Sequence, residues 1–361
     1  MTADTGGGHR SVGEAIAEAI ESVKPGWCQV IDVAAWAPFP LNQAERLYLP
    51  AINYGARVWG WLWHLTDTPG GLATTLFLLP PLLKPGLKRL FKAHQPMVVI
   101  SVHPLYTSIP VQVLREMGAE AQMITVVTDL ASAHRAWFCP DVDLLLVPNQ
   151  AVRQLAEEYG LPGQKIKVVG LPVQRKFAQL LGSKGAARQG LGLDRELTTI
   201  LLVGGGEGMG KLFQMAQAIA QTHLGVQLIV VAGRNRRLRQ KLIETAWPLP
   251  VAVFGFTEDM PRLMQAADII VTKAGPSTIS EALISGLPII LSGAIPGQEA
   301  GNVRFVLDSE VGLLVSSPQQ LVEVLRDLLR PGNDTLSHMA RRARELAYPD
   351  AASEAARLIT S

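Results

Sequence analysis

The feature that most constrains the fold is a regular alternation between short apolar runs and longer amphipathic stretches. Such runs are typical of strands buried on both faces of a parallel sheet, and the stretches between them are typical of the covering helices. Helices are expected over Gln150–Tyr159, Lys211–Gln221 and Ser277–Ser285. The expected strands are Val98–Val102, Met123–Val127, Leu144–Val147, Lys167–Val169, Thr199–Val203, Gln227–Val231, Val251–Val253, Ile269–Thr272 and Ile289–Leu291.

The β–α order runs twice, and a segment rich in glycine and charged residues separates the two runs between Gly170 and Glu196. This pattern predicts an α/β protein with two doubly wound, Rossmann-like domains facing a central cleft. The first domain is predicted at 1–175, a linker at 176–196 and the second domain at 197–345. A C-terminal helix over 346–361 is predicted, one that can cross back to the first domain.

The composition restricts the class of protein. Apolar residues make up 48% and charged residues 18%, with a net charge of +2, which indicates a folded protein and not a nucleic-acid binder. The only cysteines, Cys28 and Cys139, are far apart, which favours a reducing compartment and excludes a cysteine-based zinc site. The apolar run Leu72–Leu83 contains two prolines and is too short to span a membrane, and no apolar signal segment opens the chain. A cytoplasmic location is therefore expected.

The first candidate motif is a triglycine followed by a histidine. Gly6, Gly7 and Gly8 allow close approach of a ligand to the backbone, and His9 stands at the start of an amphipathic helix. An imidazole there can act as a general base, although a lone histidine is more often structural. Only Met1 to Thr5 precede the triglycine, so we expect a short first strand, a start that is truncated or misassigned, and weakened support for His9.

The second motif, Gly204–Lys211, joins a strand to a helix and so predicts an anion site. It approaches a P-loop in spacing, but Leu212 lacks the hydroxyl that would hold Mg²⁺, which argues against nucleoside triphosphate hydrolysis.

The third motif, Lys273–Leu283, contains a predicted helix start. Ser277 and Thr278 can cap that helix and share its amides with a diphosphate, and Glu281 can accept hydrogen bonds from a ribose. An ordinary serine-capped helix would look the same.

The fourth motif is the loop Pro296–Asn302 after the next strand. Gln298 and Glu299 offer adjacent hydrogen-bonding groups of the kind that hexose recognition needs, although Glu299 could equally be a solvated loop residue. Two polar loops at successive strand ends both favour a ligand site at the carboxyl edge of the sheet.

An Asp-x-Asp pair at Asp141 and Asp143 has the spacing of a metal site but runs directly into a strand, so we interpret it as an ordinary strand start. No other cluster has metal-ligand spacing, and no bound metal or cofactor is expected.

Tryptophan and positive charge come together in the segment that interrupts the β–α pattern. Trp59, Trp61 and Trp63 precede a basic group formed by Lys84, Lys88, Arg89 and Lys92, a combination used at anionic membrane surfaces. A buried helix followed by a solvated basic turn is the alternative.

Taken together, the motifs resemble the monogalactosyldiacylglycerol synthases and the processive diacylglycerol glucosyltransferases of glycosyltransferase family 28. The resemblance runs in family order from the first residues to beyond Val303. It is carried by Ala3–Arg10, Ser101–Leu105, Thr125–Leu130, His134, Trp137–Phe138, Gly170–Val173, Gly204–Gly210, Ala232–Asn235, Lys273–Glu281 and Pro296–Val303. Arg135 and Ser277 depart from the family's usual proline and glycine without removing an assigned role.

The resemblance implies a GT-B fold and inverting transfer of galactose or glucose from a UDP-sugar to 1,2-diacylglycerol, without a metal, at the inner face of the cell membrane. It implies that His9 is the base. The implied donor residues are Gly206, Glu207, Gly208, Arg234, Asn235, Phe254, Gly255, Phe256, Gly275, Pro276, Ser277, Thr278, Glu281, Gln298, Glu299 and Asn302. The implied acceptor-side residues are Gly7, Gly8, His103, Asp129, His134 and Trp137.

Three alternatives stay open: N-acetylglucosaminyl transfer to a lipid-linked cell-wall precursor, a UDP-sugar 2-epimerase, and a non-catalytic nucleotide- or lipid-binding protein. Diacylglycerol and an anionic phospholipid surface are the expected partners. The sequence does not decide between the two sugars or define an oligomeric state.

Overall fold

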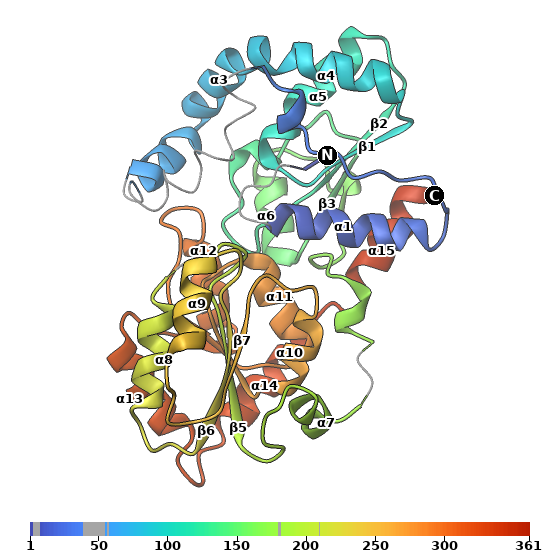
Figure 1. Cartoon of the computed structure of the whole chain (residues 1–361). Helices are drawn as coiled ribbons and strands as arrows, with labels where there is room; N and C mark the ends of the chain where they lie inside the picture. Colours follow the sequence, from blue (N-terminus) through green and yellow to red (C-terminus); the bar gives the residue numbers. More distant parts are fainter. Residues whose placement is uncertain (3–7, 39–54, 56–57, 180–181, 209) are drawn as a thin grey trace. The chain divides into compact units, whose positions relative to one another are not determined.

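A computed structural model describes residues 1–2, 8–38, 55, 58–179, 182–208 and 210–361. The chain forms two compact units (Figure 1). Unit 1 contains Met1–Arg175, Ile295–Gly301 and Asp350–Ser361, and unit 2 contains Lys176–Ala294 and Asn302–Pro349. The main segment of unit 1 ends at Arg175, which is also the last residue of the predicted first domain.

Unit 1 is built on a four-stranded parallel sheet in the order β1-β2-β3-β4. Its strands are β1 (Val98–Ser101), β2 (Gln122–Val126), β3 (Leu144–Val147) and β4 (Ile166–Val168). The apolar runs of the sequence form these strands because helices cover a parallel sheet on both faces. The helices of the unit are α1 (Gly8–Glu21), α3 (Pro69–Leu78), α4 (Pro80–His94), α5 (Ser108–Glu116), α6 (Gln150–Glu158) and α15 (Ala351–Thr360), and residues 58–66 are also helical.

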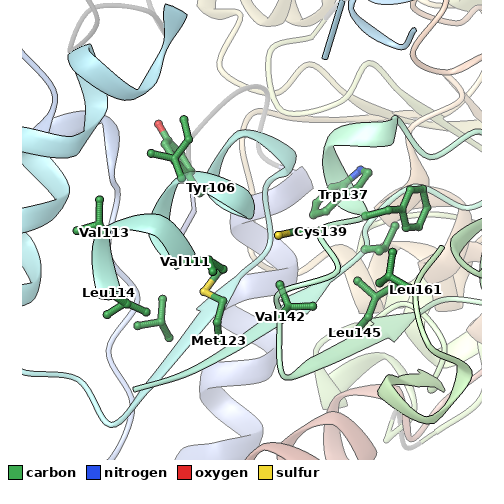
Figure 2. Packing of buried hydrophobic residues seen from close by; sticks show 14 of the residues in the cluster. Tyr106, Val111, Val113, Leu114, Met123, Trp137, Cys139, Val142, Leu145 and Leu161 are labelled. Carbon is green, nitrogen blue, oxygen red and sulfur yellow. The ribbon is translucent and has the colours of Figure 1, made fainter. Parts of the chain in front are cut away.

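The core of unit 1 packs α4, α5 and α6 against this sheet. Figure 2 shows Tyr106, Met123, Trp137 and Leu145 within one apolar cluster. Trp137 and Leu145 are both 0% exposed, so this cluster holds the residues that follow β2 in place.

The C-terminal helix α15 packs along α1 within unit 1, and the two helices lie side by side in Figure 1. The small buried side chains of Ala352, Ala355 and Ala356 allow this close approach. At the far end Lys24 donates to the Thr360 carbonyl over 2.7 Å. Since α1 begins at Gly8 and His9, α15 stabilises the helix that presents the candidate base.

Unit 2 contains a six-stranded parallel sheet in the order β10-β9-β8-β5-β6-β7. The order reverses between β5 and β8, and at such a switch point the carboxyl ends of the strands leave room for a ligand. The strands are β5 (Thr198–Val203), β6 (Val226–Val231), β7 (Val251–Phe254), β8 (Ile269–Thr272), β9 (Ile289–Leu291) and β10 (Gly312–Leu314). The helices are α7 (Lys184–Gln189), α8 (Leu212–Ala220), α9 (Arg236–Glu244), α10 (Met260–Ala266), α11 (Pro276–Ile284), α12 (Ala300–Asp308, which begins in unit 1), α13 (Pro318–Leu328) and α14 (Thr335–Leu346).

All the expected strands are present within about two residues, and the three expected helices begin and end within one residue of their observed bounds. The strand β10 was not predicted: it begins with a glycine and ends at the exposed Leu314, so it lacks the continuous buried apolar run of the other strands.

The segment predicted as a linker contains the helix α7 and belongs to unit 2. Arg188 on this helix is 5% exposed, donates to the Ala266 carbonyl over 2.9 Å and forms an ion pair with Asp268. The glycines of the segment suggested a flexible connection, whereas this buried arginine attaches it to the sheet.

Candidate active site

His9 lies in the first turn of α1, immediately after Gly8. The Oγ1 of Thr128 is 2.9 Å from its Nδ1, and its ring centroid is 4.7 Å from that of His103. Burial lowers the pKa of His9 to about 4, while a hydrogen bond with the Val102 carbonyl acts in the opposite direction. The imidazole is therefore neutral near pH 7 and able to accept a proton. The predicted acceptor residue Gly7 lies outside the described residues.

His103 and His134 are buried in equivalent local structures. Each is the N-cap residue of a short 3₁₀ helix, and its Nδ1 accepts from the amide two residues later: Leu105 at 3.3 Å and Ala136 at 3.1 Å. A neutral ring whose Nδ1 accepts carries its proton on Nε2, so each histidine offers an N–H donor.

The pKa values of both histidines are lowered, first by burial. For His103 the nearby His9 lowers the pKa further. For His134, Asp67 acts in the opposite direction, and the Nε2 of His134 is 3.2 Å from the Oγ1 of Thr66. Two neutral imidazoles with defined tautomers thus belong to the same unit as His9.

Asp129 and Trp137 form a buried pair next to His9. The indole Nε1 donates to the Oδ2 of Asp129 over 2.7 Å, and the centroids of the Trp137 and His9 rings are 6.0 Å apart. Burial raises the pKa of Asp129 to about 7; the Trp137 hydrogen bond opposes this rise, and the carboxylates of Glu299 and Asp67 add to it. Trp137 has no exposed surface, so it belongs to the core of unit 1 and holds the Asp129 carboxyl in place beside His9.

The three tryptophans predicted to contact a membrane do not share one helix face. Residues 58–66 are helical, and at about 100° per residue Trp59 and Trp63 lie on one face while Trp61 lies on the other. Trp61 is 63% exposed. The Trp63 ring is 4.8 Å from that of His134, and a Cβ at Gly297 would lie 3.1 Å from it. The structure therefore places Trp61 at the surface and Trp63 beside the candidate acceptor residues.

Much of the predicted basic surface next to these tryptophans is engaged within the protein. Lys84 and Lys88 form ion pairs with the same carboxylate, Glu116, at 2.6 and 2.7 Å. Arg89 donates to the Trp36 carbonyl over 3.2 Å. These contacts reduce the positive charge that is available for anionic lipid.

In unit 2 the backbone conformation and close packing of the loop after β5 require glycine at two positions. Gly205 and Gly208 have φ values of 69° and 62°, in the left-handed region. A Cβ at Gly208 would lie 2.0 Å from the Ala232 carbonyl oxygen, and the amide of Arg234 donates to the Gly206 carbonyl over 2.8 Å. The loops after β5 and β6 are thus packed backbone to backbone at the carboxyl end of the sheet.

Arg234 connects this loop to an exposed aromatic ring. Its Nη1 is 2.7 Å from the Oε1 of Glu207, and its guanidinium lies 4.4 Å from the centroid of Phe256. Phe256 is 58% exposed, so one flat ring beside a guanidinium is open to a planar ligand. Phe254 ends β7, and Gly255 follows it. The predicted donor residue Asn235 instead caps α9 by accepting from the Leu238 amide over 2.9 Å.

The helix α11 begins differently from the prediction. Its N-cap residue is Gly275 with no side-chain cap, Pro276 is the first helical residue, and Ser277 and Thr278 lie within the first turn. The expectation that Ser277 or Thr278 caps the helix was therefore wrong, because the helix starts earlier and a proline supplies its first position. A helix start without a side-chain cap offers its amides to an anion.

Glu281 lies one turn further along α11. Burial raises its pKa to about 8, and Lys176 opposes this rise. Sequence reasoning gave no role to Lys273, whose Cε lies 3.1 Å from the position of a Cβ on Gly205. It also missed Thr128, which gave no signal because the residue is 119 positions from His9.

In the loop after β9, most of the polar side chains form hydrogen bonds with other groups of the protein. Glu299 is 3% exposed, and its Oε2 accepts from the Ile295 amide over 2.8 Å. The amide of Gly301 donates to the Oγ of Ser132 over 3.1 Å within unit 1. Asn302, a predicted donor residue, donates to the Ala274 carbonyl over 2.9 Å within unit 2. Gln298 is more accessible than Glu299 and is the better candidate for sugar contact.

The Asp-x-Asp pair has structural partners, in agreement with its interpretation as a strand start. Asp141 pairs with Arg115 at 2.8 Å, and Asp143 accepts from the Met123 amide over 2.7 Å. Within the described part of the chain, no group of three or more His, Cys, Asp or Glu side chains could hold a metal ion. Over the same residues, no helix is long and apolar enough to cross a membrane.

Two Rossmann-like units with parallel sheets define a fold of the GT-B glycosyltransferase class. The structure is similar to MurG from Acinetobacter baumannii, with a TM-score of 0.56, 18% identity and 77% coverage of each chain.

The family described as monogalactosyldiacylglycerol (MGDG) synthase matches residues 9–173, and the glycosyltransferase family 28 C-terminal domain matches residues 199–355. Monogalactosyldiacylglycerol synthase 1 of Arabidopsis thaliana is 38% identical over 97% of this chain and 68% of its own length. The corresponding synthase of Spinacia oleracea is 37% identical over 97% of this chain and 69% of its own. The chain belongs to the monogalactosyldiacylglycerol synthase family and is a glycosyltransferase.

Proposed function

We propose that the protein transfers galactose from UDP-galactose to the free hydroxyl of 1,2-diacylglycerol, with inversion at the anomeric carbon. The observation that carries the proposal is the neutral imidazole of His9, seated at the start of α1 beside His103 and Trp137. The names of the two synthases described above favour galactose over glucose and diacylglycerol over other acceptors.

In the proposed step His9 takes the proton of the acceptor hydroxyl as its oxygen attacks the anomeric carbon. A bond forms between the acceptor oxygen and the anomeric carbon, and the bond between the anomeric carbon and the diphosphate oxygen breaks on the opposite face. The electron pair leaves with UDP. Thr128 keeps the His9 ring oriented through the contact at Nδ1, and the Nε2–H group of His103 is a donor for the acceptor's oxygens. The Nε2 of His134 already contacts Thr66, so His134 shapes the acceptor side by packing against Trp63.

The donor is proposed to bind unit 2. The first-turn amides of α11 at Ser277 and Thr278 would stabilise the diphosphate, together with the loop from Gly206 to Gly208. Glu281 would hold the ribose, the exposed ring of Phe256 would contact the uracil, and Gln298 would contact the sugar. No metal ion enters this proposal, because helix amides can supply the stabilisation that the departing diphosphate needs.

The acceptor is proposed to be taken from a membrane that unit 1 contacts peripherally, at the cytoplasmic face of the cell membrane. Val58, Trp61, Leu62 and Leu65 follow the spacing i, i+3, i+4, i+7 on one helical stretch and are between 42% and 63% exposed. Phe77 on α3 adds an aromatic side chain that is 78% exposed. Such an apolar helix face favours insertion at the headgroup level, with anionic phospholipid adding attraction.

A transfer assay tests the proposal. Radiolabelled UDP-galactose and UDP-glucose are supplied separately to the protein with diacylglycerol vesicles containing anionic phospholipid. A chloroform-soluble product from UDP-galactose is expected. A labelled lipid product from UDP-glucose alone would mean that the transferred sugar is glucose and not galactose. UDP binding without any labelled lipid would favour a cell-wall acceptor, a 2-epimerase or a non-catalytic binder.

Variants at two histidines identify the base. His9→Ala should reduce transfer at least about 1,000-fold with UDP affinity nearly unchanged. His223→Ala, at an exposed position in unit 2, is the matched control and should retain full activity. Full activity of His9→Ala would remove His9 from the mechanism.

A further inference from the structure

Two helical stretches of unit 1 with exposed apolar side chains meet at a corner formed by residues 66–68. One stretch is residues 58–66, and the other is α3, none of whose residues is buried. A Cβ on Gly71 of α3 would lie 1.9 Å from the Leu65 carbonyl oxygen, so the two stretches touch backbone to backbone. They are therefore expected to move together, and whatever holds the corner holds both apolar surfaces.

Arg135 holds this corner through two hydrogen bonds to Asp67. Its backbone amide donates to the Oδ1 of Asp67 over 2.7 Å, and its Nε donates to the Asp67 carbonyl over 3.0 Å. The amide of Asp67 in turn donates to the Trp63 carbonyl over 3.0 Å. Two bonds between the same two residues fix direction as well as distance, because one bond alone permits rotation about it.

The other side of Arg135 is attached to the core of unit 1. Its guanidinium lies 4.0 Å from the centroid of the Tyr159 ring at the end of α6. The centroid of Tyr159 is 5.2 Å from that of Phe138, which is buried in the apolar cluster of the unit. A guanidinium over an aromatic face is attracted to it, so Arg135 connects the corner to the rigid part of unit 1.

The corner also contacts the residue that precedes Arg135. The Nε2 of His134 is 3.2 Å from the Oγ1 of Thr66 and 3.9 Å from the Oδ1 of Asp67. The ring of Trp63 packs on the same imidazole. A displacement of the corner would therefore change the surface next to His134, on the candidate acceptor side.

We propose that Arg135 is a positioning residue for an acceptor that arrives from a membrane. It locks the corner to the core, so that the apolar surfaces on both sides of the corner keep one orientation relative to His134. The inference rests on the proposed function, because it assumes a lipid acceptor. Arg135 itself touches neither substrate in this proposal, and its effect is to reduce the freedom that alignment of the acceptor would otherwise lose.

Arg135→Pro removes both hydrogen-bond donors, because proline has neither an amide hydrogen nor a guanidinium. The local backbone accepts this change. His134 is extended, with φ −62° and ψ 143°, as the residue before a proline prefers, and position 135 is the first in its 3₁₀ helix. Arg135→Lys is the conservative variant, since it keeps the amide bond to Asp67 and the positive charge. Arg153→Ala is the matched control, because Arg153 pairs only along α6 with Glu157, at 3.1 Å.

Transfer to two acceptors tests the proposal: diacylglycerol in anionic vesicles and water-soluble dihexanoylglycerol. Arg135→Pro should lower kcat/KM for the vesicle acceptor at least about tenfold and leave the soluble acceptor within about twofold of the native value. Arg135→Lys should recover most of the vesicle activity, and Arg153→Ala should match the native chain. Co-sedimentation with vesicles should not change in any variant, because the exposed apolar side chains stay the same.

Hydrogen exchange supplies a readout that does not depend on activity. In Arg135→Pro the amides of Asp67 and Gly71 should exchange at least about tenfold faster, while that of Leu145 in the core stays protected. Equal losses of activity on both acceptors, or unchanged exchange at Asp67 and Gly71, would overturn the proposal. Absence of transfer by the native chain would contradict the proposed function instead, and the exchange measurement would still decide whether Arg135 locks the corner.

Discussion

The Oγ1 of Thr128 lies 2.9 Å from the Nδ1 of His9, which joins the residues after β2 to the first turn of α1. Thr128 is 1% exposed, so this contact is shielded from water. It determines which way the candidate base faces, and the proposed chemistry depends on that orientation.

Replacing Thr128 tests this contact. Thr128→Val keeps the shape but removes the hydroxyl, so His9 loses its orienting partner; kcat should fall by about 10- to 100-fold with little change in KM. Steady-state kinetics with both substrates measure the effect. Thr125→Val is the matched control, because the buried Thr125 hydroxyl has no hydrogen-bond partner among the described residues. An equal loss of kcat in both variants would contradict a specific role for Thr128.

Glu281 should make unit 2 less stable as the pH rises. Its pKa is about 8 in the folded protein against 4.5 ordinarily, so between these values the folded state binds more protons than the unfolded state. The free energy of unfolding therefore falls across pH 4.5 to 8. Relative to Glu281→Gln, the native chain should lose on the order of 2 kcal/mol between pH 5 and 8.5. Urea unfolding measures this difference.

The exposed Glu323 on α13 provides the control for this titration. Glu323→Gln should follow the pH dependence of the native chain. A Glu281→Gln profile parallel to that of the native chain would mean that Glu281 titrates normally.

Substitutions of Trp61 and Trp63, on opposite faces of the helical residues 58–66, should have different effects. Trp61→Ala removes the largest exposed side chain and should weaken co-sedimentation with anionic vesicles by about tenfold, with the unfolding midpoint unchanged. Trp63→Ala removes a ring that packs beside His134, so it should lower the unfolding midpoint and transfer rate and leave vesicle binding intact. The reverse pattern would place Trp63 at the membrane.

The two basic side chains that pair with Asp268, those of Arg188 and Lys184, should differ in their contribution to the free energy of unfolding. Arg188→Ala leaves Asp268 without its buried partner and should destabilise unit 2 by about 3 kcal/mol. Lys184 pairs with the same carboxylate over 2.7 Å from a largely solvated position, so Lys184→Ala should cost less than about 1 kcal/mol. Chemical denaturation of both variants makes the comparison, and equal losses would contradict the anchoring role of Arg188.

The sequence by itself determined nine of the ten described strands, the division near Arg175, the glycine loops and the position of His9 at a helix start. These features depend on periodicity and on the backbone freedom of glycine, which are local properties. Tertiary structure alone decided the partners: Thr128 for His9, Trp137 for Asp129 and Ile295 for Glu299.

Tertiary structure also decided which side chains are exposed and how the segment that contains Arg188 is attached to unit 2. Trp61 and Trp63 look equivalent in a list of residues, but helical geometry exposes one and packs the other against His134. Arg188 looks like a linker residue until the fold brings Asp268 to it, 80 positions away. Local pattern predicts secondary structure because the causes lie within a few residues, whereas orientation, pKa and burial arise from groups that only the folded chain brings together.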